Sequence, residues 1–451
     1  MLRLLKTLTV IGCAMLFVLS FNVLAVLGWS IVSGNAITKL HPAFFILLLV
    51  AIAGVLSVPS VYARLLANKL YLFYLAAGIL LVFRASFIAA TGITGGELSA
   101  AIITWVLPAV LLLTLQAFSS PELDRIGVAI RIFFAVNSTM GLVERVRGTH
   151  FFPSLAEGIG DPRATAFFGH PLNASLLTGL MIVHLASARR SKVPVVWRLP
   201  EMGLHGIAMF AFGGRSAMVF SVAMVIFSAI WVRQEGAERK VGAIQRMLPL
   251  IIAGAGLALV FLPLDFVDAT IDRFSNDYKS SETRNSAYQM LGFLNTHDWL
   301  FGMDANRRQI VQTFFHSPLG IELCWIALIM TYGIVAVLPM MVALPLLLYS
   351  IMRTLDRSAF YMMIYFLIVT AGSLSLGSKS LLIAQALMMM LALSQRRLMP
   401  ARAGRREAPD IWSQLSEAGP APARQPRLWD EPVAAQEEAR VPSSERPAAR
   451  L

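Results

Sequence analysis

Long apolar stretches dominate this chain and limit what it can fold into. Twelve of them approach the roughly 20 residues that a helix needs to cross the hydrocarbon core of a bilayer. Only 14% of the residues are charged, against roughly 25% in an average soluble protein. The sequence therefore predicts an all-α polytopic membrane protein with about 12 transmembrane helices. The stretches run over 9–32, 43–60, 70–90, 99–118, 126–143, 173–188, 199–213, 216–232, 247–264, 333–352, 359–376 and 380–395.

Basic residues are concentrated in every second connection between these stretches. Arg3 and Lys6 precede the first stretch, and every second connection after it is rich in arginine or lysine. The short connections on the opposite side carry only Lys39 and Lys379. Because cytoplasmic loops retain positive charge, this pattern predicts that both termini are cytoplasmic. It also accounts for much of the net charge of +12, so no nucleic-acid partner is expected.

The two ends of the chain differ in character. The first stretch is too long for the apolar region of a signal peptide and has no early Ala-x-Ala site, so we expect a retained first helix. The segment 399–451 holds eight of the 22 prolines and shows almost no aliphatic periodicity. Such a segment cannot bury enough apolar surface to fold, which predicts a disordered cytoplasmic tail after a membrane domain at 1–398.

Two predicted non-cytoplasmic loops are unusually long and carry arginine against the charge rule. They span about 144–172 and about 265–332. One interpretation is an ordinary soluble surface, since long translocated loops can carry cations without changing topology. The other is a surface that binds an anionic headgroup or phosphate, which we favour because long structureless loops are uncommon unless they are functional.

Sequence motifs for nucleotide or metal binding are missing. No Gly-Lys-Ser/Thr phosphate-binding loop follows any glycine cluster, and no HExxH or paired Cys/His ligands occur. We therefore expect neither a cofactor nor a tightly held metal.

The first long loop leads directly into a predicted helix. Pro171 suits a helix start, because its missing N–H would be unpaired there in any case. His170 and Asn173 then lie near a helix N-terminus, where an anion is favoured, although a plain capping turn explains the same residues and is preferred on residue chemistry alone. Further on, Arg215 follows two glycines at the predicted outer boundary. A binding role and snorkelling to the headgroups are equally compatible with it.

The second long loop contains a predicted helix at 282–294, with Arg284 and Tyr288 on one face. The segment 295–302 is expected to be a turn closed by glycine. An apolar stretch at 319–330 reads as an interfacial or re-entrant helix, and Glu322 lies within it. A carboxylate at membrane depth is costly enough to indicate a role or a buried partner.

Three places resemble the O-antigen ligase and Wzy-type polysaccharide polymerase superfamily. Arg163-Ala-Thr-Ala-Phe-Phe-Gly169-His170-Pro171-Leu-Asn173 resembles that family's Arg-x-Thr-Gly-x-x-Gly-Asn/His-Pro helix start. Arg215 resembles the arginine of its Ser-Arg element, with Gly214 in place of the serine. Arg284-(x3)-Tyr288-(x9)-Asp298-Trp-Leu-Phe-Gly302 resembles its Arg-x3-Trp...Pro-x-x-Gly-x-Gly stretch.

Two departures from the family pattern bear on whether the chain is expected to be a polymerase or an O-antigen ligase. Gly302-Met303-Asp304 lacks the second glycine of the family's Gly-x-Gly, and His316 lies 17 residues before Gly333 instead of about a dozen. Glu322 is closer to the expected spacing. These departures favour a polymerase or a divergent polysaccharide protein over an O-antigen ligase.

The resemblance implies glycosyl transfer from an undecaprenyl-diphosphate-linked oligosaccharide to an acceptor glycan. Arginine suits a diphosphate leaving group, because it supplies permanent charge and bidentate geometry without a metal. On this hypothesis Arg163 and Arg215 clamp the diphosphate, Arg284 assists its departure, and His316 or Glu322 is the general base. Further candidate substrate-binding residues are His170, Asn173, Tyr288, Arg307 and Arg308.

The expected function is thus polymerisation of lipid-linked repeats into exopolysaccharide, capsule or O-antigen at the periplasmic face of a bacterial inner membrane. Membrane lipids and other polysaccharide-assembly proteins are further candidate partners. An O-antigen ligase is the alternative within the family. From other classes, a glycolipid transporter or flippase and a non-catalytic scaffold acting through its tail remain open, although transporters usually place ionisable groups near the bilayer midplane.

Overall fold

The computed structural model describes helices and turns between Met1 and Gln395. The predicted stretch at 247–264 and the predicted tail at 399–451 lie outside the described residues. The described residues are 1–29, 39–90, 96–152, 163–188, 193–231, 280–315, 321, 323–373 and 376–395.

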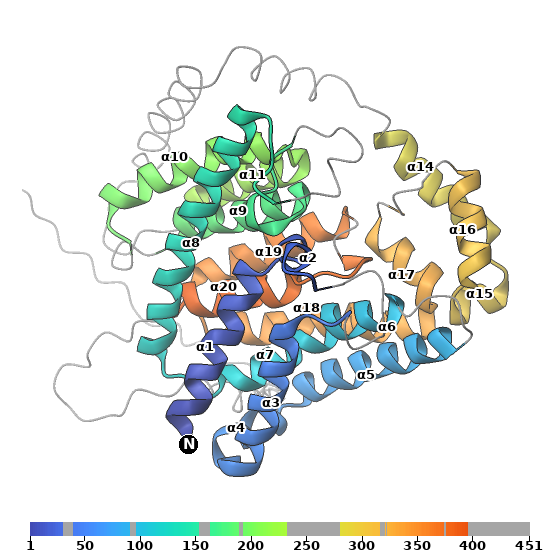
Figure 1. Ribbon diagram of the computed structural model, residues 1–451, viewed down its shortest axis with the longest axis horizontal. Helices are drawn as coiled ribbons and strands as arrows, with labels where there is room; N and C mark the ends of the chain where they lie inside the picture. The colour runs from blue at the N-terminus through green and yellow to red at the C-terminus, as the bar shows by residue number, and fades with distance from the viewer. Residues whose placement is uncertain are drawn as a thin grey trace, which may run out of the picture. The chain divides into compact units, whose positions relative to one another are not determined.

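Prolines divide the first part of the chain into helices. Pro42 and Pro59 each begin a helix, where a missing N–H costs nothing, and the chain bends by 108° at Val58 between them. The helices here are α1 (Leu2–Val18), α2 (Phe21–Val26), α3 (Pro42–Ser57), α4 (Pro59–Leu66) and α5 (Lys69–Ala90), as Figure 1 shows.

A wider turn interrupts the next apolar helix. α6 (Gly96–Ala101) and α7 (Leu107–Leu115) are joined by a π-helical turn, η1 (Ile102–Val106). Pro108 follows this turn and cannot donate to the carbonyl four residues earlier, which is Thr104. The Thr104 hydroxyl donates to the Ser378 carbonyl (3.1 Å) and accepts from the Ser380 N–H (3.0 Å). The irregular turn is thereby tied to the connection before the last described helix.

The middle of the chain forms a longer helix, α8, two helices that pack against it, α9 and α10, and a fourth, α11, that packs against α9. α8 begins at a capping box made by Ser119 and Glu122 and ends at Gly148, whose φ is +67°. Gly213, with φ of +66°, ends α10 in the same left-handed conformation, which glycine adopts without strain. The helices are α8 (Ser120–Arg147), α9 (Pro171–Ser187), α10 (Val195–Phe212) and α11 (Arg215–Trp231), with a 3₁₀ turn, η3, at Ala166–Phe168.

The last third of the described chain is also helical. The predicted helix at 282–294 corresponds to α14 (Ser280–Met290) and the 3₁₀ turn η4 (Leu291–Phe293). The segment 295–302, expected to be a turn, instead forms the short helix α15 (Thr296–Phe301), because Asn295 and Asp298 make a capping box. The other helices are α16 (Ala305–Phe314), α17 (Cys324–Tyr332), α18 (Ile334–Met352), α19 (Arg357–Ala371) and α20 (Leu382–Leu393).

Helix α20 is buried on every side. All twelve of its residues are buried, and it packs against α7, α8, α9 and α19. Its one polar side chain, Gln385, donates to the Leu16 carbonyl of α1 at 2.6 Å. Helix α8 approaches α20 closely at Gly127, where a Cβ would lie 2.5 Å from the Ala392 carbonyl oxygen. Small residues at such crossings are typical of helices that pack without a hydrophobic driving force between them.

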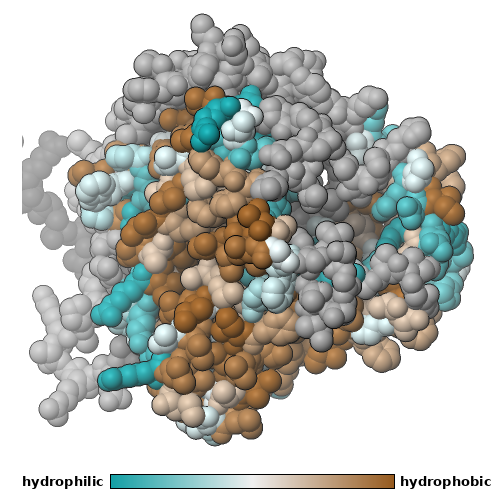
Figure 2. Space-filling view, viewed as in Figure 1, coloured by the Kyte–Doolittle hydropathy of each residue, from teal (hydrophilic) through white to brown (hydrophobic). Residues whose placement is uncertain are grey.

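The outer helices turn apolar side chains away from the bundle. Phe83 and Phe87 of α5 are 71% and 62% exposed, and Ile132 of α8 is 61% exposed. Figure 2 shows that apolar residues cover much of the visible face. Apolar side chains exposed in this way are expected on helices that face lipid.

The described helices support an all-helical membrane protein, and the part of the chain described contains no strand. Four helices are long and apolar enough to cross a bilayer, or five if the bent pair α3 and α4 is one span. Helices lie at the other predicted positions within the described residues, but several are shorter than a full span, such as α19 with 15 residues and α20 with 12. The number of 12 spans, the loop topology and the cytoplasmic termini stay predictions.

Two glycines let the backbone cross itself where the second loop meets α17 and α18. Gly302 and Gly333 have φ of +85° and +77°. A Cβ on Gly302 would collide with the Thr331 carbonyl, and one on Gly333 with the Leu300 carbonyl. The Met303 N–H donates to the Met330 carbonyl at 2.8 Å, so the two backbones are bonded at the crossing.

We predict that Gly302→Ala and Gly333→Ala each lower the free energy of unfolding by about 2–4 kcal/mol, because each adds strain at positive φ and a backbone collision. The measurement is the thermal unfolding of the purified full chain in detergent. Gly206→Ala is the control, since Gly206 lies within α10 and a Cβ there meets nothing within 4 Å. Equal stability of all three variants would contradict the crossing.

Candidate functional site

A buried carboxylate holds together the parts of the first long loop that the structure describes. Glu144, near the end of α8, is 2% exposed and accepts three backbone hydrogen bonds. They come from the N–H groups of Phe151 (2.9 Å), Thr165 (2.8 Å) and Ala166 (2.8 Å). Ala166 has φ of +44°, a conformation that needs such support in a residue with a Cβ. Sequence analysis did not assign Glu144 this role.

The segment after this anchor lies against the turn between α10 and α11. The Ala164 N–H donates to the Ala211 carbonyl at 3.0 Å, and Ser175 of α9 contacts Gly214 so closely that no Cβ would fit there. Arg163 directly precedes the first contact, and Arg215 directly follows the second. The fold therefore brings Arg163 and Arg215, 52 positions apart, to one end of the α9–α11 group; we call them the arginine pair. Both side chains are half-buried.

Two helices also begin at the arginine pair. The ring Nδ1 of His170 accepts from the Leu172 N–H at 3.2 Å, so His170 caps α9, and Asn173 lies in the first turn. Helix α11 begins at Arg215 itself. Each N-terminus carries a positive end of a helix dipole and N–H groups that lack partners within the helix. The positive charge of the arginine pair is thus reinforced by two helix ends, an arrangement that favours an anion.

Arg307 and Arg308 are both paired with carboxylates of the protein. Arg307 bonds Asp298 of α15 through Nη1 (2.5 Å) and the Phe293 carbonyl of η4 through Nη2 (2.8 Å), which holds α16 against both. Arg308 bonds Glu97 at the start of α6 (2.6 Å), and both side chains are largely buried, at 14% and 12% exposure. These contacts give the two arginines a supporting role in the second loop.

The remaining predicted residues of the second loop are on or beyond α14. Arg284 and Tyr288 are exposed, and the Tyr288 ring lies 5.9 Å from that of Trp325 in α17. His316 and Glu322 lie outside the described residues. The structure therefore assembles the predicted residues of the first loop with Arg215, whereas Tyr288, Arg307 and Arg308 belong to a second group attached to α6 and α17.

An ionisable cluster that sequence analysis missed lies between α8 and α10. Arg131 pairs with Glu201 through two nitrogens, and both are largely buried. His205, one turn after Glu201 and fully buried, bonds the Ser138 hydroxyl through Nδ1 at 2.8 Å. The available signal was the placement of Glu201 and His205 at i and i+4 in a stretch otherwise apolar, which puts both on one face of α10.

Lys39 and Lys379 form a second pair of cations, and each lies in a connection that was predicted on the outer side. Lys379 donates to the Lys39 carbonyl and lies 4.9 Å from the centre of the Phe21 ring. Burial, reinforced by the charge of Lys39, lowers the pKa of Lys379 to about 8. Nearby, burial lowers the pKa of His41 to about 4, so this histidine is neutral near pH 7. The two lysines that were predicted on the outer side are therefore neighbours.

Comparison with family models, with curated proteins and with solved structures finds no match for this chain. Among the described residues no group of three His, Cys, Asp or Glu side chains is placed to hold a metal ion.

The lowered pKa of Lys379 predicts a stability that depends on pH. The unfolded chain, with a lysine pKa near 10.5, binds more protons than the folded chain between about pH 8 and 10.5. The wild type should therefore gain stability relative to Lys379→Met as the pH rises through this range. Thermal unfolding of the two proteins at several pH values measures the difference. Lys69→Met, at an exposed position, is the control, and a difference independent of pH would contradict the prediction.

Proposed function

We propose that this protein transfers a glycan from a polyprenyl-diphosphate-linked donor to a glycan acceptor, with the arginine pair as the diphosphate-binding site. The observation that carries the proposal is the meeting of Arg163, Arg215 and the N-termini of α9 and α11 at one place. Two guanidinium groups and two helix ends suit a group with two neighbouring phosphates. Apolar helices adjoin the site, as a polyprenyl chain requires.

The proposed reaction is a substitution at the anomeric carbon of the donor sugar. The acceptor hydroxyl oxygen forms the new bond to this carbon while the bond from the carbon to the diphosphate oxygen breaks. The bonding electrons leave with the diphosphate, and the hydroxyl proton passes to a general base. Positive charge fixed at the diphosphate stabilises the transition state, because negative charge develops there as the bond breaks.

The other proposed roles come from the second loop. Arg284 would assist the leaving group, and His316 or Glu322 would take the proton. Tyr288 is a candidate contact for the sugar, since aromatic rings offer a flat apolar face. We assign Arg307 and Arg308 to holding the loop, because both pair with carboxylates of the chain. This assignment replaces their expected role as substrate ligands.

Within this class we favour a polymerase of lipid-linked repeats in a bacterial inner membrane over an O-antigen ligase. Deletion of the gene is expected to leave different glycans for the two enzymes. Loss of polymer with accumulation of a single-repeat lipid intermediate supports the polymerase. Polymer retained on its lipid carrier supports the ligase.

We predict that Arg215→Ala and Arg284→Ala reduce glycosyl transfer at least about a hundredfold, because each removes a positive charge that stabilises the departing diphosphate. Product length is followed on gels with purified full-length protein and a polyprenyl-diphosphate-linked oligosaccharide. Arg353→Ala, after the end of α18, is the control. Normal product length in both test variants, with membrane insertion unchanged, would remove the arginine assignment.

A membrane transporter or flippase for a glycolipid is the second candidate, and one observation favours it. Arg131, Glu201 and His205 form an ionisable cluster between two apolar helices, and transport sites often use such groups at membrane depth. Because the pair Arg131–Glu201 is largely buried, removing one partner is also expected to destabilise the helix packing.

Glu201→Gln separates the two candidates. If the protein is an enzyme, this variant keeps glycosyl transfer in detergent to within about tenfold of the wild type once the amount of folded protein is matched, because Glu201 does not contact the diphosphate site. The parallel assay measures movement of a labelled glycolipid across proteoliposomes. Movement by the wild type without any glycosyl transfer, lost in Glu201→Gln, would establish the transporter instead.

A further inference from the structure

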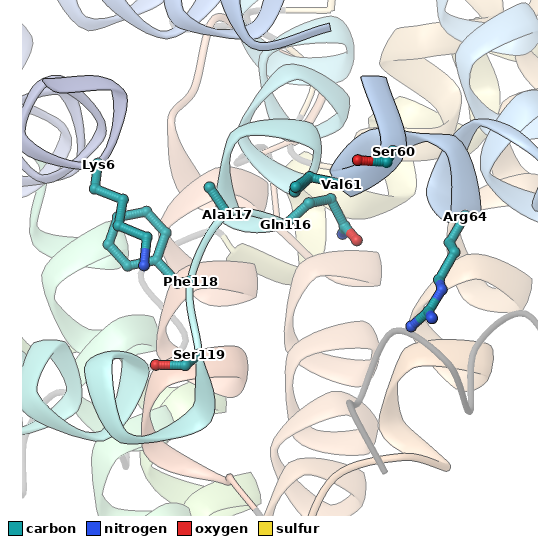
Figure 3. A pocket seen from close by; sticks show the side chains of 8 residues that line it. All are labelled: Lys6, Ser60, Val61, Arg64, Gln116, Ala117, Phe118 and Ser119. Atoms are coloured by element: carbon teal, nitrogen blue, oxygen red, sulfur yellow. The ribbon is translucent and has the colours of Figure 1, made fainter. Parts of the chain in front are cut away.

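A pocket of about 380 Å³ opens at the N-terminal end of α8. It lies between the start of α1, helix α4 and the connection from α7 to α8 (Figure 3). Along α8, at about 1.5 Å per residue, Ser119 is roughly 37 Å from Glu144, so this pocket is remote from the arginine pair. The lining residues are Lys6, Ser60, Val61, Arg64, Gln116, Ala117, Phe118 and Ser119.

The pocket is placed where lipid headgroups are expected. Helix α4 follows α3 with a bend of 108°, so it runs across the direction of α3 and not along it. The charge pattern of the sequence predicts that Lys6, Arg64 and the neighbouring Arg125 face the cytoplasm. Basic pockets between helices on that side of a membrane are suited to phosphate-bearing headgroups.

Two cations flank the pocket. Figure 3 shows Lys6 on one side and Arg64 on the other. Glu122 bonds the Lys6 ammonium through both oxygens (2.7 and 2.8 Å) and also accepts from the N–H and hydroxyl of Ser119. Lys6 is thereby fixed at the edge of the pocket. Counting Lys6, Arg64 and Glu122 leaves one net positive charge, and the N-terminus of α8 adds to it.

Arg64 can serve this site whatever else it contacts, because a guanidinium has five N–H donors. Phosphate and guanidinium match in bidentate geometry, which a lysine ammonium cannot provide. The arginine therefore supplies orientation as well as charge.

Gln116 favours a ligand that carries a hydrogen-bond donor as well as a phosphate. Its side chain is 5% exposed, and its Nε2 donates to the Leu112 carbonyl at 3.2 Å. Its Oε1 is buried and accepts no hydrogen bond from the part of the chain that the structure describes. A buried acceptor without a partner is unfavourable, so a ligand that brings a hydroxyl or ammonium donor would stabilise this arrangement.

We propose that this pocket binds the headgroup of a glycerophospholipid, with the phosphodiester between Lys6 and Arg64 and a hydroxyl or ammonium donor on Gln116. Val61, Ala117 and Phe118 supply an apolar wall for the glycerol and upper acyl region. Phosphatidylglycerol and phosphatidylethanolamine carry both required groups, whereas phosphatidylcholine has the phosphate without a donor. The proposal is independent of the proposed glycosyl transfer, because no residue is shared with the arginine pair.

The test measures the thermal shift of the purified full chain in detergent with short-chain phosphatidylethanolamine, short-chain phosphatidylcholine or free glycerol phosphate. The two lipids are both zwitterionic, so they differ in the headgroup donor and not in net charge. The wild type should bind phosphatidylethanolamine about tenfold more tightly than phosphatidylcholine, which corresponds to one hydrogen bond of about 1.4 kcal/mol. Gln116→Met should remove this preference. Arg64→Gln should weaken binding of both lipids about tenfold or more, and Arg125→Gln, an exposed neighbour, should change neither.

Val61→Trp is a second route to the same test, because it fills the pocket without changing a charge. It should abolish the shift by phosphatidylethanolamine. An undiminished shift in folded Val61→Trp, or equal shifts by the two lipids in the wild type, would overturn the proposal. Free glycerol phosphate acting as strongly as phosphatidylethanolamine would also overturn it, in favour of a soluble phosphate ester.

Discussion

The need to pair every backbone N–H and C=O group in apolar surroundings governs this structure. Helices meet it internally, and the difficult places are therefore those where the chain leaves a helix. At one such place Glu144 accepts hydrogen bonds from three backbone N–H groups, which belong to two parts of the first loop. The same carboxylate thereby sets the path of the chain that leads to Arg163. The candidate site depends on a residue that does not belong to it.

Buried side chains meet the same requirement elsewhere by pairing across long distances in sequence. Arg308 and Glu97 are 211 residues apart, and the Tyr332 hydroxyl donates to the carbonyl of Glu97 at 3.0 Å. Arg131 and Glu201 join α8 to α10. Each of these groups would be costly alone, so the pairs specify which helices become neighbours. Apolar packing alone would discriminate less between alternative partners.

Sequence reasoning succeeds here where the signal is local. Apolar length predicts where α5, α8 and α18 lie, and Pro171 predicts the start of α9. Arg163 and Arg215 could be singled out because each interrupts a local charge rule. Their proximity was implied only by resemblance to a family, because their segments are 52 positions apart.

The features that were not predicted depend on which side chains pair in the folded chain. Asp298 lies only 9 positions before Arg307, but the sequence pattern does not show that the two side chains form an ion pair. Arg131 and Glu201 are 70 positions apart, so their pairing depends on the packing of α8 against α10. Span lengths are equally difficult, because the apolar pattern persists through breaks and short helices such as α17. Only the tertiary structure shows where a hydrogen-bonded helix ends.

The burial of α20 has a consequence for the order in which this protein is assembled. This helix is synthesised after every other described helix, yet it occupies the interior, and Gln385 reaches back over 369 positions to α1. Until α20 is made, the faces of α7, α8 and α9 that it covers lack their protein partner, and lipid chains would cover them. Insertion of α20 would then displace lipid from its neighbours. A chain that ended before Leu382 would leave their packing surfaces exposed and prone to aggregation.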